Sequence, residues 1–137
     1  MIYSFTGKYE KFNPYTIHIV DCDGAQYPSI VNAVEASKFA NYMKKRIMQL
    51  CLPSAAFKMG AAAPYTEEQV DLCQSLIREA YSEDTELLLS MTGSIVFANN
   101  FHDNFYGACS CPKCSYAKKY NWVGKTLEDM RDELKEG

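Results

Sequence analysis

The segment TEEQVDLCQSLIREAY at residues 66–81 is the clearest structural signal in this chain of 137 residues. Its start fits a capping box, in which the side chains of Thr66 and Gln69 satisfy free amide groups of the first helical turn. Apolar residues then recur at helical spacing, at Val70, Cys73, Ile77 and Ala80. The segment therefore predicts a helix over 66–81.

Two more helices are expected before this segment. A helical run over about 30–40 follows Ser29, a residue type that caps helices, and we expect it to continue, kinked, to about residue 50. A shorter helix with Ser54 as its cap should end near Gly60.

Short strands are expected on both sides of the helical segments. Residues 2–5 and the β-branched stretch 16–20 predict two of them, and Asp23-Gly24 predicts a turn directly afterwards. The apolar run 95–98 predicts a third strand.

The C-terminal third is expected to hold two helices and a long loop. A helix over 83–91 should close at Gly93, and the last helix should be capped by Thr126. Between the strand at 95–98 and this last helix, residues 99–123 form a loop that is long for a compact domain. Such loops are usually functional.

Composition is typical of a globular protein with one domain. Hydrophobic residues make up 47% and charged residues 23%, and no linker or repeat divides residues 1–137. The formal net charge of -3 does not attract the phosphates of duplex nucleic acid, and no apolar run is long enough to cross a membrane. We predict one α+β domain, compact and largely helical with a small sheet, whose partner is neither duplex nucleic acid nor a membrane.

The start of the chain and its cysteines indicate a compartment. The first residues, MIYSFTGKYEKF, lack the basic and apolar regions of a secretory signal. We therefore expect a cytoplasmic protein whose six cysteines are not paired in disulfides. The oligomeric state is left open, with a homo-oligomer as one alternative.

The expected loop is rich in side chains that bind nucleotides. Phe101 and Tyr106 can stack on a base, and Asp103 and Asn104 can hydrogen-bond ribose hydroxyls or ring nitrogens. The alternative is a loop that a few buried aromatic side chains hold in place.

The helix expected at 30–40 carries a polar face. Val31, Glu35 and Lys38 share one side of it, and Asn32 lies next to that side. The alternative interpretation is a solvated face on which Glu35 and Lys38 form a salt bridge.

Three cysteines lie close together in the loop, at Cys109, Cys111 and Cys114. A structural zinc ion takes four ligands, so three thiolates need a further partner. His102 is one candidate, and a distant cysteine is another. The sequence leaves open either a structural zinc or free thiols.

Several short patterns occur in a fixed order between residues 27 and 134. They are Tyr27-Pro28-Ser29 with Glu35-Ala36-Ser37-Lys38-Phe39, Pro53-Ser54-Ala55-Ala56 with Lys58-Met59-Gly60, Leu87-Leu88-Leu89 with Thr92-Gly93, His102-Asp103-Asn104-Phe105-Tyr106-Gly107, and Asn121 with Gly124-Lys125, Leu127, Met130-Arg131 and Leu134. Together they resemble the NADAR family, named for its link to NAD and ADP-ribose metabolism. The resemblance implies a largely helical α+β fold. It also implies cleavage of N-glycosidic bonds in phosphoribosyl-type metabolites or in ADP-ribose attached to a base.

The chain departs from the family at two carboxylates. Val31 stands where the resemblance implies Glu, and Phe97 ends the strand where it implies a second Glu. Tyr106 replaces the family's Trp. Glycosidic hydrolysis passes through an oxocarbenium-like state that a carboxylate stabilises, and neither valine nor phenylalanine can do this.

We predict that the loop and the 30–40 helix share one ligand site. Its residues are Asn32, Glu35, Lys38, Phe101, Asp103, Asn104, Tyr106, Gly107 and Asn121. The primary hypothesis is a protein that binds and sequesters an ADP-ribose-type nucleotide without turnover. One alternative is an active N-glycosidase or ADP-ribosyl hydrolase that uses Glu35. The other is an interaction module stabilised by zinc at Cys109–Cys114.

Overall fold

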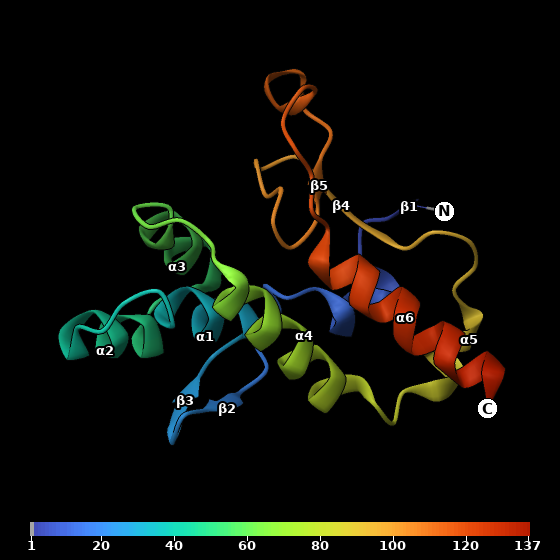
Figure 1. Cartoon of the computed structure of the whole chain (residues 1–137), viewed down its shortest axis with the longest axis horizontal. Helices are drawn as coiled ribbons and strands as arrows, with labels where there is room; N and C mark the ends of the chain where they lie inside the picture. The colour runs from blue at the N-terminus through green and yellow to red at the C-terminus, as the bar shows by residue number, and fades with distance from the viewer. Residues whose placement is uncertain (1) are drawn as a thin grey trace. The chain divides into compact units, whose positions relative to one another are not determined.

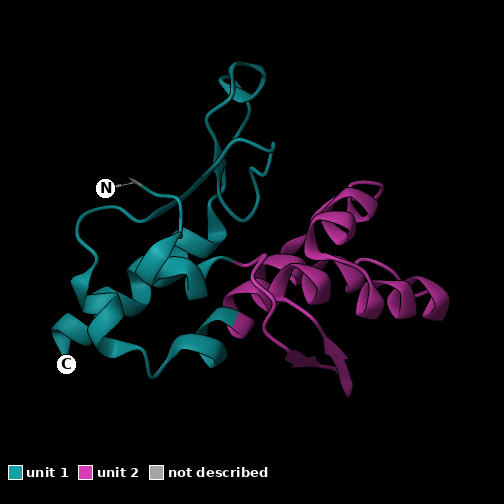
Figure 2. Ribbon diagram, turned by 180° about the vertical axis from the view of Figure 1, so that it is seen from behind, with its two compact units in different colours: residues 1–13, 77–137 teal, residues 14–76 magenta. Residues whose placement is uncertain are grey.

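A computed structural model describes residues 2–137 and divides the chain into two compact units. The central unit consists of residues 14–76, and the terminal unit consists of residues 1–13 and 77–137 (Figure 2). The chain is α+β and largely helical with small sheets, which confirms the predicted fold class (Figure 1). That residues 1–137 form one domain stays a prediction. Within the described part of the chain, no helix is both long and apolar enough to cross a membrane.

The central unit packs short helices beside a β-hairpin. Its elements are β2 (Val20–Cys22), β3 (Ala25–Tyr27), α1 (Ile30–Ala36), α2 (Tyr42–Leu50), α3 (Pro53–Gly60) and the first part of α4 (Glu67–Tyr81). All seven residues of α1 are buried, and α1 contacts α2, α3 and both strands. Helix α1 is therefore the core of this unit.

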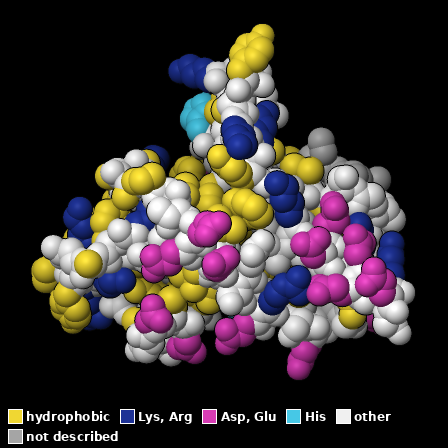
Figure 3. Space-filling view, viewed as in Figure 1, with side chains coloured by type: hydrophobic (Ala, Val, Ile, Leu, Met, Phe, Trp, Pro, Cys, Tyr) yellow, Lys and Arg dark blue, Asp and Glu magenta, His cyan; other side chains and the backbone are white. Residues whose placement is uncertain are grey.

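The terminal unit contains a parallel sheet and two further helices. Its elements are β1 (Ile2–Tyr3), η1 (Gly7–Phe12), α5 (Thr85–Ser90), β4 (Val96–Asn99), β5 (Ala108–Cys109), η2 (Pro112–Cys114) and α6 (Trp122–Glu136). The strands lie in the order β1-β4-β5. Tyr3 pairs with Phe97, and Ala98 pairs with Ala108. Acidic side chains gather over α6, whose exposed positions include Asp129, Asp132 and Glu133 (Figure 3).

Several predicted elements are confirmed. The capping box forms as expected, because the amide of Thr66 donates to Oε1 of Gln69 at 2.8 Å, and the helix runs over Glu67–Tyr81. Asp23 and Gly24 both have positive φ, 51° and 78°, and form the turn of the β2–β3 hairpin. The helix at 53–60 ends at Gly60.

Other predicted boundaries were wrong. The strand expected at 16–20 begins only at Val20, because Ile17 and Ile19 are 60% and 63% exposed and have no face to bury. The run expected over 30–50 is two helices, since the Ser37 hydroxyl bonds to the Val34 carbonyl where α1 ends, and Asn41 caps α2.

Two predicted caps were also wrong. Leu52, followed by Pro53 at the first helical position, precedes α3, so Ser54 lies inside the helix. Asn121 is at the N-cap of α6, and Thr126 lies inside that helix with its hydroxyl on the Trp122 carbonyl.

Asn121 joins α6 to strand β4. Its backbone is left-handed, with φ 49°, a conformation that Asn tolerates better than most residues. Its Oδ1 accepts from the Phe97 amide at 2.9 Å, and its Nδ2 donates to the Ile95 carbonyl at 2.9 Å. The Asn121 side chain therefore acts as a neighbouring strand would. It satisfies the Phe97 amide in β4 and the Ile95 carbonyl just before β4.

Replacing Asn121 with Ala should destabilise the protein by about 2–6 kcal/mol, because it leaves two buried backbone groups unsatisfied and each costs about 1–3 kcal/mol. Urea unfolding measures this loss. Asp129→Ala, an exposed change on the same helix, should cost less than about 0.5 kcal/mol. Equal losses in the two variants would contradict the role given to Asn121.

Candidate functional site

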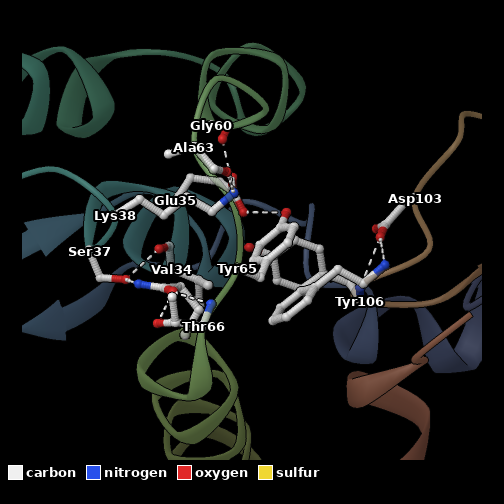
Figure 4. A network of polar contacts seen from close by, with 12 residues as sticks. Val34, Glu35, Ser37, Lys38, Gly60, Ala63, Tyr65, Thr66, Asp103 and Tyr106 are labelled. Carbon is white, nitrogen blue, oxygen red and sulfur yellow. Dashed lines mark hydrogen bonds and ion pairs between the residues drawn. The ribbon is translucent and has the colours of Figure 1, made fainter. Parts of the chain in front are cut away.

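A buried ion pair lies inside the central unit. Nζ of Lys38 lies 3.0 Å from Oε1 of Glu35, and the two side chains are 1% and 0% exposed. The carbonyls of Gly60 and Ala63 accept from the same ammonium at 2.9 and 3.0 Å (Figure 4). The salt bridge expected between Glu35 and Lys38 is therefore confirmed, but it is buried rather than solvated.

Tyr65 completes this group, and the sequence analysis missed it. Its hydroxyl donates to Oε2 of Glu35 at 2.7 Å, and its ring lies under the ammonium of Lys38, 3.4 Å from Nζ to the ring centroid. A cation is attracted to an aromatic face, so the ring adds a fourth stabilising contact to the ammonium. Tyr65 lies in the non-helical stretch before α4, where no periodic pattern of apolar residues indicates which side chains are buried.

The buried pair depends on a glycine at position 60. A Cβ atom at Gly60 would lie 1.7 Å from Oε1 of Glu35, which is far inside contact distance. Burial lowers the pKa of Lys38, while the attraction of Glu35 opposes that change. The ammonium is thus stabilised by fixed neighbours in place of water.

In the terminal unit, Asp103 shapes the loop before β5. Its Oδ1 accepts from the amides of Phe105 and Tyr106 at 3.0 and 2.8 Å (Figure 4). Asn99 bonds to both the amide and the carbonyl of Asp103. This carboxylate fixes a turn in the backbone, as Asp side chains commonly do.

The two aromatic residues predicted to stack on a ligand differ in exposure. Phe101 is 45% exposed, whereas Tyr106 is fully buried and packs edge-on against Phe105 with centroids 4.9 Å apart. Gly107 follows at a position where a Cβ atom would lie 2.0 Å from the Phe97 carbonyl oxygen. Phe101 is therefore the stacking candidate that a ligand can reach.

Three predicted amide contacts serve internal hydrogen bonds. Asn32 donates to the carbonyls of Met48 and Cys51 and so connects α1 to the end of α2. Asn104 accepts from the Cys109 amide at 2.9 Å, and Asn121 bonds to β4 as described above. Their roles as ligand contacts stay predictions.

The two positions that lack carboxylates are core positions. Val31 is fully buried in α1. Phe97 is 1% exposed, and its ring stacks on Phe5 with centroids 5.2 Å apart and planes 9° apart. Both side chains are buried, and a carboxylate buried at either position would need a cation or hydrogen-bond donors to replace its water.

The loop cysteines and one histidine form a cluster. Ligand atoms of His102, Cys109, Cys111 and Cys114 all lie within 4.8 Å of one another, so these residues could hold a metal ion. All six cysteines of the chain carry free thiols. Burial raises the pKa of the Cys109 thiol, but hydrogen bonds from the Cys111 and His102 amides and from the Cys111 and Cys114 thiols together lower that pKa.

The central unit also has a hollow that the sequence did not predict. It has a volume of about 800 Å³ and lies between the β2–β3 hairpin and α2, with Tyr27, Tyr42, Lys45 and Arg46 among its lining residues. None of the predicted ligand residues lines it. The site predicted between the 30–40 helix and the loop would join the two units, and it stays a prediction.

Breaking the buried pair should be far more costly than breaking an exposed one. Lys38→Met leaves the Glu35 carboxylate buried without its cation and should cost about 3–5 kcal/mol in unfolding free energy. Arg78→Met breaks the exposed pair with Glu133 and should cost at most about 1 kcal/mol.

The double variant Glu35→Gln with Lys38→Met distinguishes the energy of the ion pair from the energy that each side chain contributes by packing. Its cost should be smaller than the sum of the two single losses, since neither charge is left alone. Additive losses in urea unfolding would show that Glu35 and Lys38 do not act as a pair.

Comparison with known proteins relates this arrangement to one solved fold. No family model matches the chain, and no curated protein matches it. The chain is similar to the NMR structure of the E. coli protein YbiA, a NADAR-family protein, with a TM-score of 0.70 and 20% identity over 98% of this chain and 84% of that one. At this identity the likeness establishes the fold, and the chain has a NADAR-like fold.

Proposed function

We propose that this protein binds an ADP-ribose-type nucleotide and holds it without cleaving it. The observation that carries this proposal is the packing of Val31 and Phe97. The resemblance to the NADAR family implies catalytic carboxylates at both positions, and here both side chains are buried among apolar neighbours. The NADAR-like fold supports a nucleotide-related function, and the two replacements argue against turnover.

Packing explains why these positions do not serve hydrolysis. Phe97 is stacked on Phe5 and also lies edge-on to Phe101, with centroids 6.3 Å apart. A carboxylate there would have to give up its hydration without a cation to replace it. Sequestration needs only affinity, which does not require a catalytic carboxylate.

Glu35 is the carboxylate on which the alternative function depends. An N-glycosidase or ADP-ribosyl hydrolase could use it because Tyr65 and Lys38 orient both of its oxygens. The same contacts favour a structural role, since an oxygen that already bonds to a buried ammonium is poorly placed to activate water. We therefore assign Glu35 to the fold of the central unit.

Turnover separates the two functions. NAD⁺ contains ADP-ribose attached to a base, so the purified protein should leave it chemically intact after long incubation, as measured by chromatography of free nicotinamide. Multiple turnovers by the unmodified protein that disappear in Glu35→Gln would establish the enzyme instead. Circular dichroism of Glu35→Gln controls for loss of fold.

Stacking on Phe101 should contribute to binding. Base–aromatic stacking is worth about 1–3 kcal/mol, so Phe101→Ala should weaken ADP-ribose binding roughly ten- to hundredfold in calorimetry. Tyr116→Ala is the matched control because Tyr116 is fully exposed in the same unit. Unchanged affinity in Phe101→Ala would remove Phe101 from the binding site. Tyr106→Ala is a poor probe, since a buried ring is lost from the core.

A further inference from the structure

We propose that His102, Cys109, Cys111 and Cys114 bind one zinc ion, and that this ion fixes the loop between β4 and α6. The inference does not depend on the proposed function, because none of these four residues is assigned to contact the nucleotide. It assigns the cluster a structural role in shaping the loop.

The distances in the cluster match a tetrahedral site. Nδ1 of His102 lies 3.3 Å from Sγ of Cys111, 3.4 Å from Sγ of Cys114 and 4.0 Å from Sγ of Cys109. A tetrahedral zinc with Zn–S bonds of about 2.3 Å and a Zn–N bond of about 2.0 Å holds sulfur and nitrogen roughly 3.6 Å apart. The nitrogen–sulfur distances are therefore close to those that zinc requires, and all four ligand atoms lie within 4.8 Å of one another.

The backbone around the cluster supports thiolate ligands. The amides of His102 and Cys111 both point at Sγ of Cys109, at 3.3 and 3.4 Å. Hydrogen bonds from a second layer of groups orient the ligands of metal sites and stabilise their charge. Oδ1 of Asn104 further fixes Cys109 by accepting a hydrogen bond from the Cys109 backbone amide.

The backbone conformation of His102 directs its ring toward the three thiols. Its φ is 68°, in the left-handed region that few residues other than Gly adopt. With this backbone conformation, Nδ1 of His102 lies within 4.0 Å of all three thiols. A residue keeps such a conformation where its surroundings favour it, and a metal ion bound by Nδ1 would favour this one.

The chemistry of the ligands selects zinc. Three thiolates and one imidazole are a complete structural zinc set, with no position left for water or substrate. Four-cysteine sets are typical of iron–sulfur clusters, and hard cations such as Mg²⁺ prefer oxygen. A closed Cys₃His site therefore indicates a structural ion rather than a catalytic one.

The segment beyond the cluster lies at the surface and is tied back at Tyr120, whose amide donates to the Asn104 carbonyl at 2.8 Å. Residues 115–120 are all exposed, and Tyr116 is fully so. Lysine side chains lie over this loop, at Lys113, Lys118 and Lys119 (Figure 3). The ion would connect His102 to the three cysteines and close the chain between them, so that the turn at Asp103 lies inside a fixed ring.

Metal content tests the proposal directly. Protein purified with a reducing agent and without chelator should contain one zinc ion per chain by elemental analysis. Replacing the zinc with Co²⁺ should give the intense absorption of tetrahedral cobalt bound by thiolates. A protein that carries no zinc and gives only the weak spectrum of octahedral Co²⁺ would overturn the proposal.

Ligand variants locate the ion. Cys111→Ser and His102→Asn should weaken Zn²⁺ binding by more than about 100-fold, since changes one layer further out already cost about 10–100-fold. Both residues are partly exposed, and Asn tolerates the left-handed backbone at 102. Cys51→Ser and His18→Asn are the controls. Zinc affinity that falls equally in the controls would contradict the assignment.

Proteolysis tests the structural role without any measure of function. Removing zinc with a chelator should speed tryptic cleavage after Lys113, Lys118 and Lys119, while cleavage after Lys44 and Lys45 in the central unit stays unchanged. The same sites should be cut rapidly in Cys111→Ser before any chelator is added. Equal cleavage rates with and without zinc would refute the claim that the ion fixes the loop.

Discussion

The buried pair of Glu35 and Lys38 is the interaction on which the central unit depends. Removing two charges from water is costly, and the gain from their attraction offsets that cost only when further hydrogen bonds satisfy both groups. Gly60 at the end of α3, and Ala63 and Tyr65 in the segment that follows, provide those contacts. The need for glycine at position 60 follows from this requirement, because any Cβ atom there would clash with the Glu35 carboxylate.

The terminal unit uses polar side chains in a comparable way, but to satisfy backbone groups. Asn121 bonds to β4 on one side of the sheet region, and Asp103 and Asn99 fix the turn that follows β4. Residues that resemble a ligand-binding set in sequence are thus largely engaged in holding a short sheet and a long loop together. Phe101 is the exception, because its ring is substantially exposed. We therefore propose that the base of the nucleotide stacks on Phe101 and that the buried carboxylates stabilise the fold.

Sequence patterns predicted the elements whose signals are local. The capping box at Thr66 and the turn at Asp23 need only their own neighbours, and both formed as expected. Ile17 and Ile19 show the limit, since β-branched residues predict a strand only where a face is buried, and these two are exposed. Tyr65 could not be found because its role depends on a helix thirty residues earlier in the chain. His102 was named as a candidate fourth ligand, but only the folded loop shows its nitrogen beside three thiols.

The central claim is that a nucleotide is held and not consumed. Mass spectrometry of small molecules released by heating the freshly purified protein tests it most directly, because no ligand has to be chosen beforehand. We expect an ADP-ribose-type nucleotide, with any N-glycosidic bond intact, in the unmodified protein and a much smaller amount in Phe101→Ala. Release of only a free base and a ribosyl product, or of no nucleotide from either protein, would contradict it.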